Sequence, residues 1–150
     1  MNSIELQQYL HNYIPLSKAM EVTVVNVQPD GITLSAPLAP NINHRDTVFG
    51  GSASAVAILA AWSLLHTRLT SSGISSRLVI QRNSMHYERP ISGTFTARSF
   101  ILTGTTWALF LRMLQRKGRA RITVSCVIEY DGQVVGQFEG EFVALGENGT

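Results

Sequence analysis

The chain has 150 residues, of which 45% are hydrophobic and 15% charged, and its formal net charge is +2. This length fits one domain spanning residues 1–150, with a polar tail at 146–150, and leaves no room for a second. Such a mild charge does not by itself indicate nucleic acid, because phosphate binding needs cations clustered on one face, and we expect no nucleic-acid partner. The low share of charged residues suggests a subunit interface.

The cysteine content and the first residues set the expected location. The single Cys126 excludes an intramolecular disulfide and fits a reducing compartment. Residues 1–5 lack the basic-then-apolar pattern of a signal peptide. Residues 47–67 carry no formal charge when His66 is neutral, yet they are too rich in Gly, Ser and Ala to favour a membrane span. We therefore expect a cytoplasmic protein with no membrane partner.

The first forty residues predict a helix and a hairpin. Residues 4–14 place apolar side chains at a nearly helical spacing, and Ser3 is a candidate N-cap. Residues 20–28 and 32–38 have the composition of strands and flank Pro29-Asp30-Gly31, a turn signal. The two segments are therefore expected to pair.

A long uncharged helix follows the polar loop at residues 43–49. Gly50 and Gly51 precede it, its apolar residues from Ser52 to Leu65 cover every face, and residues 71–73 break it. The rest of the chain consists of strand-like runs joined by short turns containing glycine, which predict an antiparallel meander. These runs are residues 78–89, 93–102, 105–116, 119–130 and 133–145.

This order of elements predicts the hotdog fold. A helix that is apolar all round must be enclosed, and the only wrapper that the chain supplies is a strongly curved antiparallel sheet. The expected class is therefore α+β, with one long central helix wrapped by five to six strands.

Three segments resemble a known family. They are Asn-His-Arg-Asp-Thr-Val-Phe-Gly-Gly-Ser at 43–52, Met-His-Tyr-Glu-Arg-Pro at 85–90 and Gly-Arg-Ala-Arg-Ile at 118–122. Together they resemble the YiiD C-terminal family, a thioesterase-type domain of the hotdog superfamily, over nearly the whole chain. The resemblance implies an enzyme that hydrolyses an acyl-CoA or acyl-carrier thioester, with no cofactor beyond the coenzyme A of its substrate. It also implies a homodimer joined sheet edge to sheet edge, often paired again into a homotetramer, with acyl thioester sites at the dimer interface.

The chain departs from one group of relatives at the start of the helix. Phenylacetate-pathway-type thioesterases carry His-Gly-Gly there and a catalytic carboxylate further along the helix. Here Phe49 takes the histidine position, and residues 52–65 contain no Asp or Glu. This gap motivates an alternative function, a non-catalytic module that binds acyl thioesters or lipids. A dehydratase of the same fold fits less well, since those enzymes also use a histidine and a helix carboxylate.

The catalytic candidates are Asn43, Asp46 and Gly51. The N–H of Gly51 at the helix start can hold the thioester carbonyl and the oxyanion formed from it, although a glycine pair also serves a tight turn. Asp46, the nearest carboxylate in sequence, is a candidate general base for water or a simple helix-start residue. Asn43 is expected to fix the water or the acyl carbonyl, or else to bond its own loop.

Substrate contacts are expected from the loop, the helix start, a later strand and a basic segment. A loop histidine or a strand histidine is more often structural than catalytic, and the four scattered histidines predict no metal site. The basic segment suits the phosphates of coenzyme A, but it also fits a solvated hairpin turn at residues 117–118. The serines at the helix start lie in no nucleophile elbow. The expected contact residues are His44, Thr47, Phe49, Gly50, Ser54, His86, Tyr87, Lys117 and Arg119.

Overall fold

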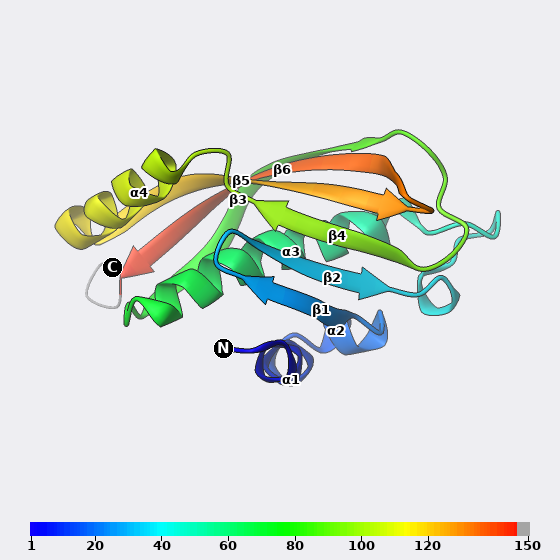
Figure 1. Cartoon of the computed structure of the whole chain (residues 1–150), viewed down its shortest axis with the longest axis horizontal. Helices are drawn as coiled ribbons and strands as arrows, with labels where there is room; N and C mark the ends of the chain where they lie inside the picture. Colours follow the sequence, from blue (N-terminus) through cyan, green and yellow to red (C-terminus); the bar gives the residue numbers. More distant parts are fainter. Residues whose placement is uncertain (147–150) are drawn as a thin grey trace.

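A six-stranded antiparallel sheet curves around one long helix (Figure 1), in a computed structural model that describes residues 1–146 except the side chain of residue 105. The strand order is β1-β2-β4-β5-β6-β3, and the predicted hotdog fold is confirmed. The predicted polar tail at 146–150 lies outside the described residues after position 146. The strands are β1 (Thr23–Gln28), β2 (Gly31–Ala36), β3 (Ser76–Tyr87), β4 (Phe95–Phe100), β5 (Arg119–Tyr130) and β6 (Gln133–Gly146).

The central helix α3 (Gly50–Ser71) packs against strands β2 to β6. Val56, Ala60 and Leu64 on its inner side are fully buried. The buried Ser99 of β4 fixes the helix to the sheet, because its Oγ donates to the carbonyl of Ala60 at 2.8 Å and accepts from the N–H of Ile32 at 3.3 Å. None of the described helices is both long enough and apolar enough to cross a membrane.

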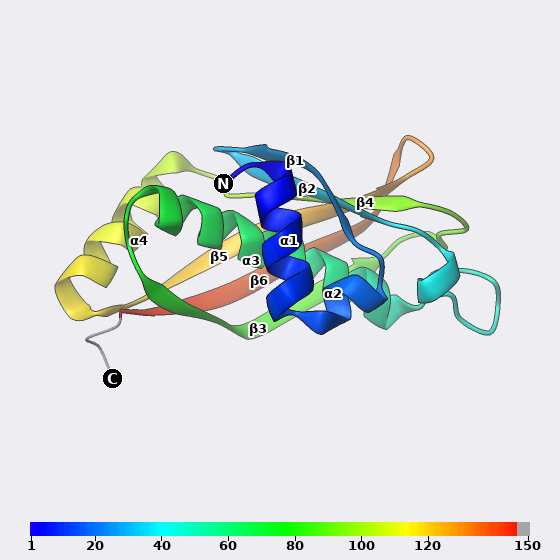
Figure 2. The same cartoon turned by 90° about the horizontal axis from the view of Figure 1, so that it is seen from below.

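Two short helices begin the chain. The side chain of Asn2 caps α1 (Ser3–Tyr13) and Glu5 bonds back to the Asn2 N–H, so the predicted cap at Ser3 is wrong by one residue. Pro15 opens α2 (Pro15–Ala19), at a helix position where the missing N–H has no cost. Figure 2 shows α1 crossing over α3.

The helix α1 also covers one edge of the sheet. The side chain of Gln7 accepts from the N–H of Val24 at 2.9 Å, and the ring of His11 donates to the carbonyl of Val22 at 2.8 Å. These bonds occupy polar backbone groups beside β1 that would otherwise be free. At the other edge, β3 has no strand beyond it in the described chain, so β3 is the open edge.

The strand predicted at residues 105–116 is wrong, because this segment is the helix α4 (Gly104–Lys117). Phe110 and Leu114 lie one turn apart and are both buried. Gly118, with φ at 70°, ends the helix in the left-handed conformation that glycine adopts readily. The apolar run is compatible with either period, and the helix end at Gly118 replaces the hairpin turn expected there.

The predicted meander is also wrong in its strand order. Strand β3 pairs with β6, and β4 pairs with β2 and with only the second half of β5. Figure 2 shows β3 and β4 on opposite sides of α3, joined by the long link at residues 88–94. Strand β3 therefore lies at the far edge of the sheet, beyond β6, although it precedes β4 in the chain.

The Ser99 anchor generates a stability prediction. Ser99→Ala removes both hydroxyl bonds at a buried position, so we expect the free energy of unfolding to fall by about 1–3 kcal/mol. Urea denaturation measures this change, and Ser84→Ala on the exposed outer face of β3 is the matched control, with an expected change below about 0.5 kcal/mol. Equal effects of the two substitutions would contradict the anchoring role.

Candidate active site

A buried asparagine fixes the point at which the chain enters α3. Asn41 ends the short 3-10 helix η1 (Ala39–Asn41), is 2% exposed, and donates from Nδ2 to the carbonyls of Met20 and Pro37. Its own carbonyl accepts from the N–H of Phe49 at 2.7 Å. Asn41 could not be predicted from the sequence, since nothing in the local pattern distinguishes a buried loop asparagine from an exposed one.

Asn43 builds the loop that follows. Its Oδ1 accepts from the N–H groups of Arg45 at 2.8 Å and Thr47 at 3.2 Å, and its Nδ2 donates to Thr47 Oγ1 at 2.9 Å. Both ends of the amide are therefore engaged within the loop, as one of the two interpretations had it. A role of Asn43 or Thr47 on the substrate stays a prediction.

Asp46 lies at the exposed tip of this loop. Its φ of 62° is left-handed, and its N–H donates to the carbonyl of Asn43 at 3.3 Å. Aspartate tolerates this conformation better than most residues, which gives Asp46 a structural reason to stand here. Within the described chain, neither the Asp46 carboxylate nor the exposed His44 ring makes a hydrogen bond or ion pair.

The start of α3 carries two unpaired backbone donors. The N–H groups of Ser52 and Ala53 bond to the carbonyl of Phe49, whereas those of Gly50 and Gly51 have no partner among the described residues. The Phe49 ring is 58% exposed and lies across Gly51, since a Cβ placed on Gly51 would come within 2.4 Å of it. The positive end of the helix dipole thus meets free donors beside an aromatic ring.

Tyr87 closes the other side of the helix start. Tyr87 is the last residue of β3. Its hydroxyl donates to the carbonyl of Gly50 at 2.9 Å, and its ring lies against Gly50. A shallow pocket of about 230 Å³ lies beside this contact. It is lined by Val48, Gly50, Ala53, Tyr87, Glu88, Arg89, Pro90 and Ile91.

Glu88 is a carboxylate at this pocket that the sequence analysis did not single out. Its Oε1 accepts from Gln137 Nε2 at 2.8 Å, which holds the side chain beside the end of β3. The sequence signal for Glu88 is its position directly after Tyr87, inside the segment 85–90 that carries the family resemblance. The site therefore has two candidate carboxylates, Asp46 and Glu88.

Three of the expected contact residues lie away from the helix start of their own chain. Successive strand residues point to opposite faces, so His86 points away from α3 while Tyr87 points toward it. Arg119 pairs with Leu145, which pairs with Arg77 at the far end of β3. Because ten residues of β3 separate that end from Tyr87, Lys117 and Arg119 lie about 30 Å from Gly51.

Ser54, another expected contact residue, lies half-buried one turn into α3. Two titratable groups lie deeper in the fold. Burial lowers the pKa of His66, which stacks on Tyr9 and Trp62, and burial raises the pKa of the Cys126 thiol to about 12. No group of three or more His, Cys, Asp or Glu side chains suited to a metal ion occurs in the described residues.

Comparison with known proteins places the chain in a family. The model of the family described as "Putative thioesterase (yiiD_Cterm)" matches residues 3–146, and the chain belongs to this family. The fold is thus that of a thioesterase-type hotdog domain.

Several solved structures share the fold. A protein of unknown function from Chlorobaculum tepidum TLS has a TM-score of 0.92 at 28% identity, covering 97% of this chain and 94% of that chain. A protein from Shewanella oneidensis described as a "putative thioesterase" has a TM-score of 0.85 at 26% identity, covering 95% and 96%. A "probable thioesterase" from Pseudomonas aeruginosa shares the fold, with a TM-score of 0.81 at 18% identity over 96% of both chains.

The Tyr87 contact generates a prediction about the helix start. Tyr87→Phe removes the hydroxyl that holds the Gly50 carbonyl, so we expect faster amide hydrogen exchange in residues 49–53 and unchanged exchange in residues 56–69. The free energy of unfolding should fall by no more than about 1.5 kcal/mol. Tyr13→Phe on α1 is the control, and unchanged exchange at residues 49–53 in Tyr87→Phe would show that the bond does not hold the helix start.

Proposed function

We propose that the protein hydrolyses an acyl thioester whose carbonyl oxygen is held by the unpaired N–H of Gly51. The observation that carries this proposal is the pair of free donors at the start of α3, next to a pocket, in a chain of a thioesterase-type family. Such a donor stabilises the oxyanion more than the ground-state carbonyl, and it is worth roughly 3–4 kcal/mol in a preorganised site.

Water activation is assigned to a carboxylate of the same site. Asp46 is the candidate from the loop, with Asn43 orienting its surroundings, and Glu88 is the candidate from the end of β3. An ionised carboxylate within reach of a water accepts its proton as the water attacks the thioester carbon. The proton then leaves with the thiol, and the products are a carboxylic acid and the free carrier thiol.

The acyl chain is proposed to run along the outer stripe of α3. Ser54, Ile58 and Trp62 recur about every turn and are only half-buried, so they form one stripe along α3 that begins one turn after Gly50. The pocket of about 230 Å³ beside Gly50 is smaller than the range of roughly 300–1,000 Å³ typical of ligand sites. A second subunit would enlarge and close it.

A homodimer formed through β3 would supply that second wall. The twelve-residue β3 is the open edge of the sheet, whereas α1 protects the β1 edge. Antiparallel pairing of two β3 strands reverses their ends, so the segment 116–121 of one subunit lies toward the helix start of the other. Its cations, including Lys117 and Arg119, would then meet the phosphates of coenzyme A or of a carrier's phosphopantetheine.

A second candidate function is binding of acyl thioesters without turnover. It is favoured by the exposed position of Asp46, whose carboxylate makes no described contact with the start of α3. In this case the Gly51 donor holds the substrate carbonyl, and no base completes the reaction. Both functions use the same donors and differ only in water activation.

The donor role generates a paired test at Gly51. Gly51→Pro removes the N–H in the first helical turn, where proline is tolerated, and Gly51→Ala keeps it. We expect kcat/KM for acyl-CoA hydrolysis to fall about 100-fold in Gly51→Pro and less than about tenfold in Gly51→Ala. Equal losses would assign the effect to displacement of Phe49, and circular dichroism checks that both variants fold.

The carboxylate role generates a second test. Asp46→Asn and Glu88→Gln remove one candidate base each, so we expect one of them to lower kcat by about 100-fold or more with little change in KM. A panel of acyl-CoA and acyl-carrier thioesters, with released thiol and acid measured by mass spectrometry, supplies the substrates. Wild-type rates in both variants exclude these bases, and tight binding of a non-hydrolysable analogue with no turnover of the panel supports the binding function.

A further inference from the structure

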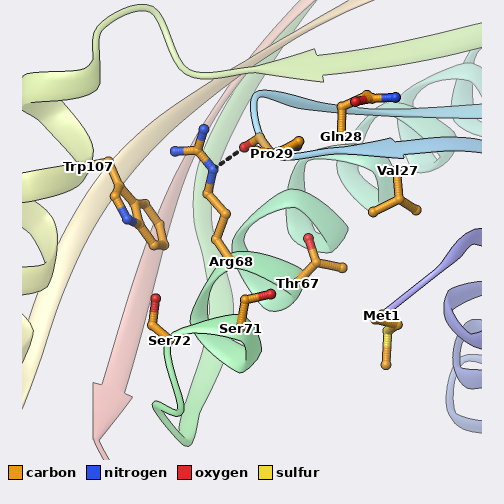
Figure 3. A pocket seen from close by; sticks show the side chains of 9 residues that line it. All are labelled: Met1, Val27, Gln28, Pro29, Thr67, Arg68, Ser71, Ser72 and Trp107. Carbon is orange, nitrogen blue, oxygen red and sulfur yellow. Dashed lines mark hydrogen bonds between the residues drawn. The ribbon is translucent and has the colours of Figure 1, made fainter.

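A second pocket lies at the other end of α3. It has a volume of about 540 Å³ and is formed by the last turns of α3, the β1–β2 turn and the start of α4 (Figure 3). Arg68 is seventeen residues beyond Gly51, so the two sites are about 25 Å apart along the helix. The lining residues are Met1, Val27, Gln28, Pro29, Thr67, Arg68, Ser71, Ser72 and Trp107.

Arg68 has most of its donors unused. Its Nε donates to the carbonyl of Pro29 at 2.6 Å, while the terminal N–H groups make no hydrogen bond or ion pair with any described residue. Figure 3 shows the guanidinium held between Pro29 and the ring of Trp107, whose centroid lies 5.1 Å from Cζ. The guanidinium is thus fixed in position by one bond and one aromatic face, with its fork free for another group.

The electrostatics of Arg68 favour an anionic partner. Burial lowers the pKa of the guanidinium, and the nearby Asp30 opposes this effect without coming within ion-pair distance. Arginine nevertheless stays charged in proteins. A partly buried cation with no bonded carboxylate loses hydration that its present contacts replace only in part. A carboxylate that accepts hydrogen bonds from the two terminal nitrogens would offset the remaining desolvation cost.

The remaining lining defines the rest of the ligand. Val27, Pro29 and Trp107 provide apolar walls, and the hydroxyls of Ser71 and Ser72 have no described hydrogen-bond partner. Arg68 carries the only charged side chain among the lining residues, the amino group of Met1 is a second cation of the lining, and the nearby Asp30 acts on Arg68 with the opposite charge. A site of such low net positive charge matches a monoanion better than a phosphate dianion, which usually recruits two or three cations.

We propose that this pocket binds a small organic monocarboxylate, with its carboxylate on the terminal N–H groups of Arg68 and its apolar body against Trp107. The site stands apart from the Gly51 junction and is formed only because α4 brings Trp107 over the end of α3. A carboxylic acid is also the class of product that thioester hydrolysis would release. Binding here does not depend on the proposed hydrolysis and is tested without any thioester.

Two-dimensional ¹H–¹⁵N NMR tests this proposal, because the indole N–H groups of Trp62 and Trp107 give separate signals. Benzoate is the probe, benzamide is its uncharged match, and phenyl phosphate tests the dianion. We expect benzoate to shift the Trp107 indole N–H saturably and to leave that of Trp62 unmoved, with benzamide and phenyl phosphate binding at least about tenfold more weakly. Equal binding of benzoate and benzamide, or a shift of Trp62 alone, would overturn the proposal.

Substitutions then assign the effect to Arg68. We expect Arg68→Gln to weaken benzoate binding by about tenfold or more, and Arg68→Lys to weaken it less. Arg112→Gln, which makes the same charge change on an exposed part of α4, should bind benzoate like the wild type. Equal losses in Arg68→Gln and Arg112→Gln would reduce the effect to general electrostatics and overturn the site. If Arg68→Gln fails to fold, the wild-type comparison of benzoate with benzamide decides alone.

Discussion

The rest of the structure depends on the need to enclose α3. Its 22 residues contain one formally charged side chain, Arg68, and eleven of its residues are buried. Water cannot accommodate such a helix alone, so the sheet must curve around it, and packing against β2 to β6 does this. The curvature in turn decides which strand ends meet each end of the helix.

Both ends of α3 gather polar groups for the same reason. A helix leaves its first N–H groups and its last carbonyls without partners inside the helix. The only formally charged side chain of α3, Arg68, lies in its last turn. The end of β3 meets the first turn through Tyr87, and the β1–β2 turn meets the last turn through Arg68. The helix α3 thus has polar groups at each end, and a different part of the sheet contacts each end.

The backbone donors of the candidate active site follow from the fold more directly than the candidate base does. Free backbone donors at Gly50 and Gly51 follow from helix geometry and need no particular side chain. The carboxylates lie outside the helices and strands, Asp46 at a loop tip and Glu88 directly after the last residue of β3. Both carboxylates are exposed to water in the single chain.

The sequence by itself determined the long apolar helix, the first hairpin and the hotdog class, because these follow from local periodicity and from turn residues, while the glycine pair expected before the helix forms its first two residues. It failed at residues 105–116, where an apolar run fits a strand and a helix equally well and packing against β5 decides. Only the tertiary structure placed Glu88 beside the helix start, turned His86 away and set Lys117 and Arg119 at the far end of the sheet. Those positions depend on strand order and curvature, which arise from contacts between residues distant in sequence.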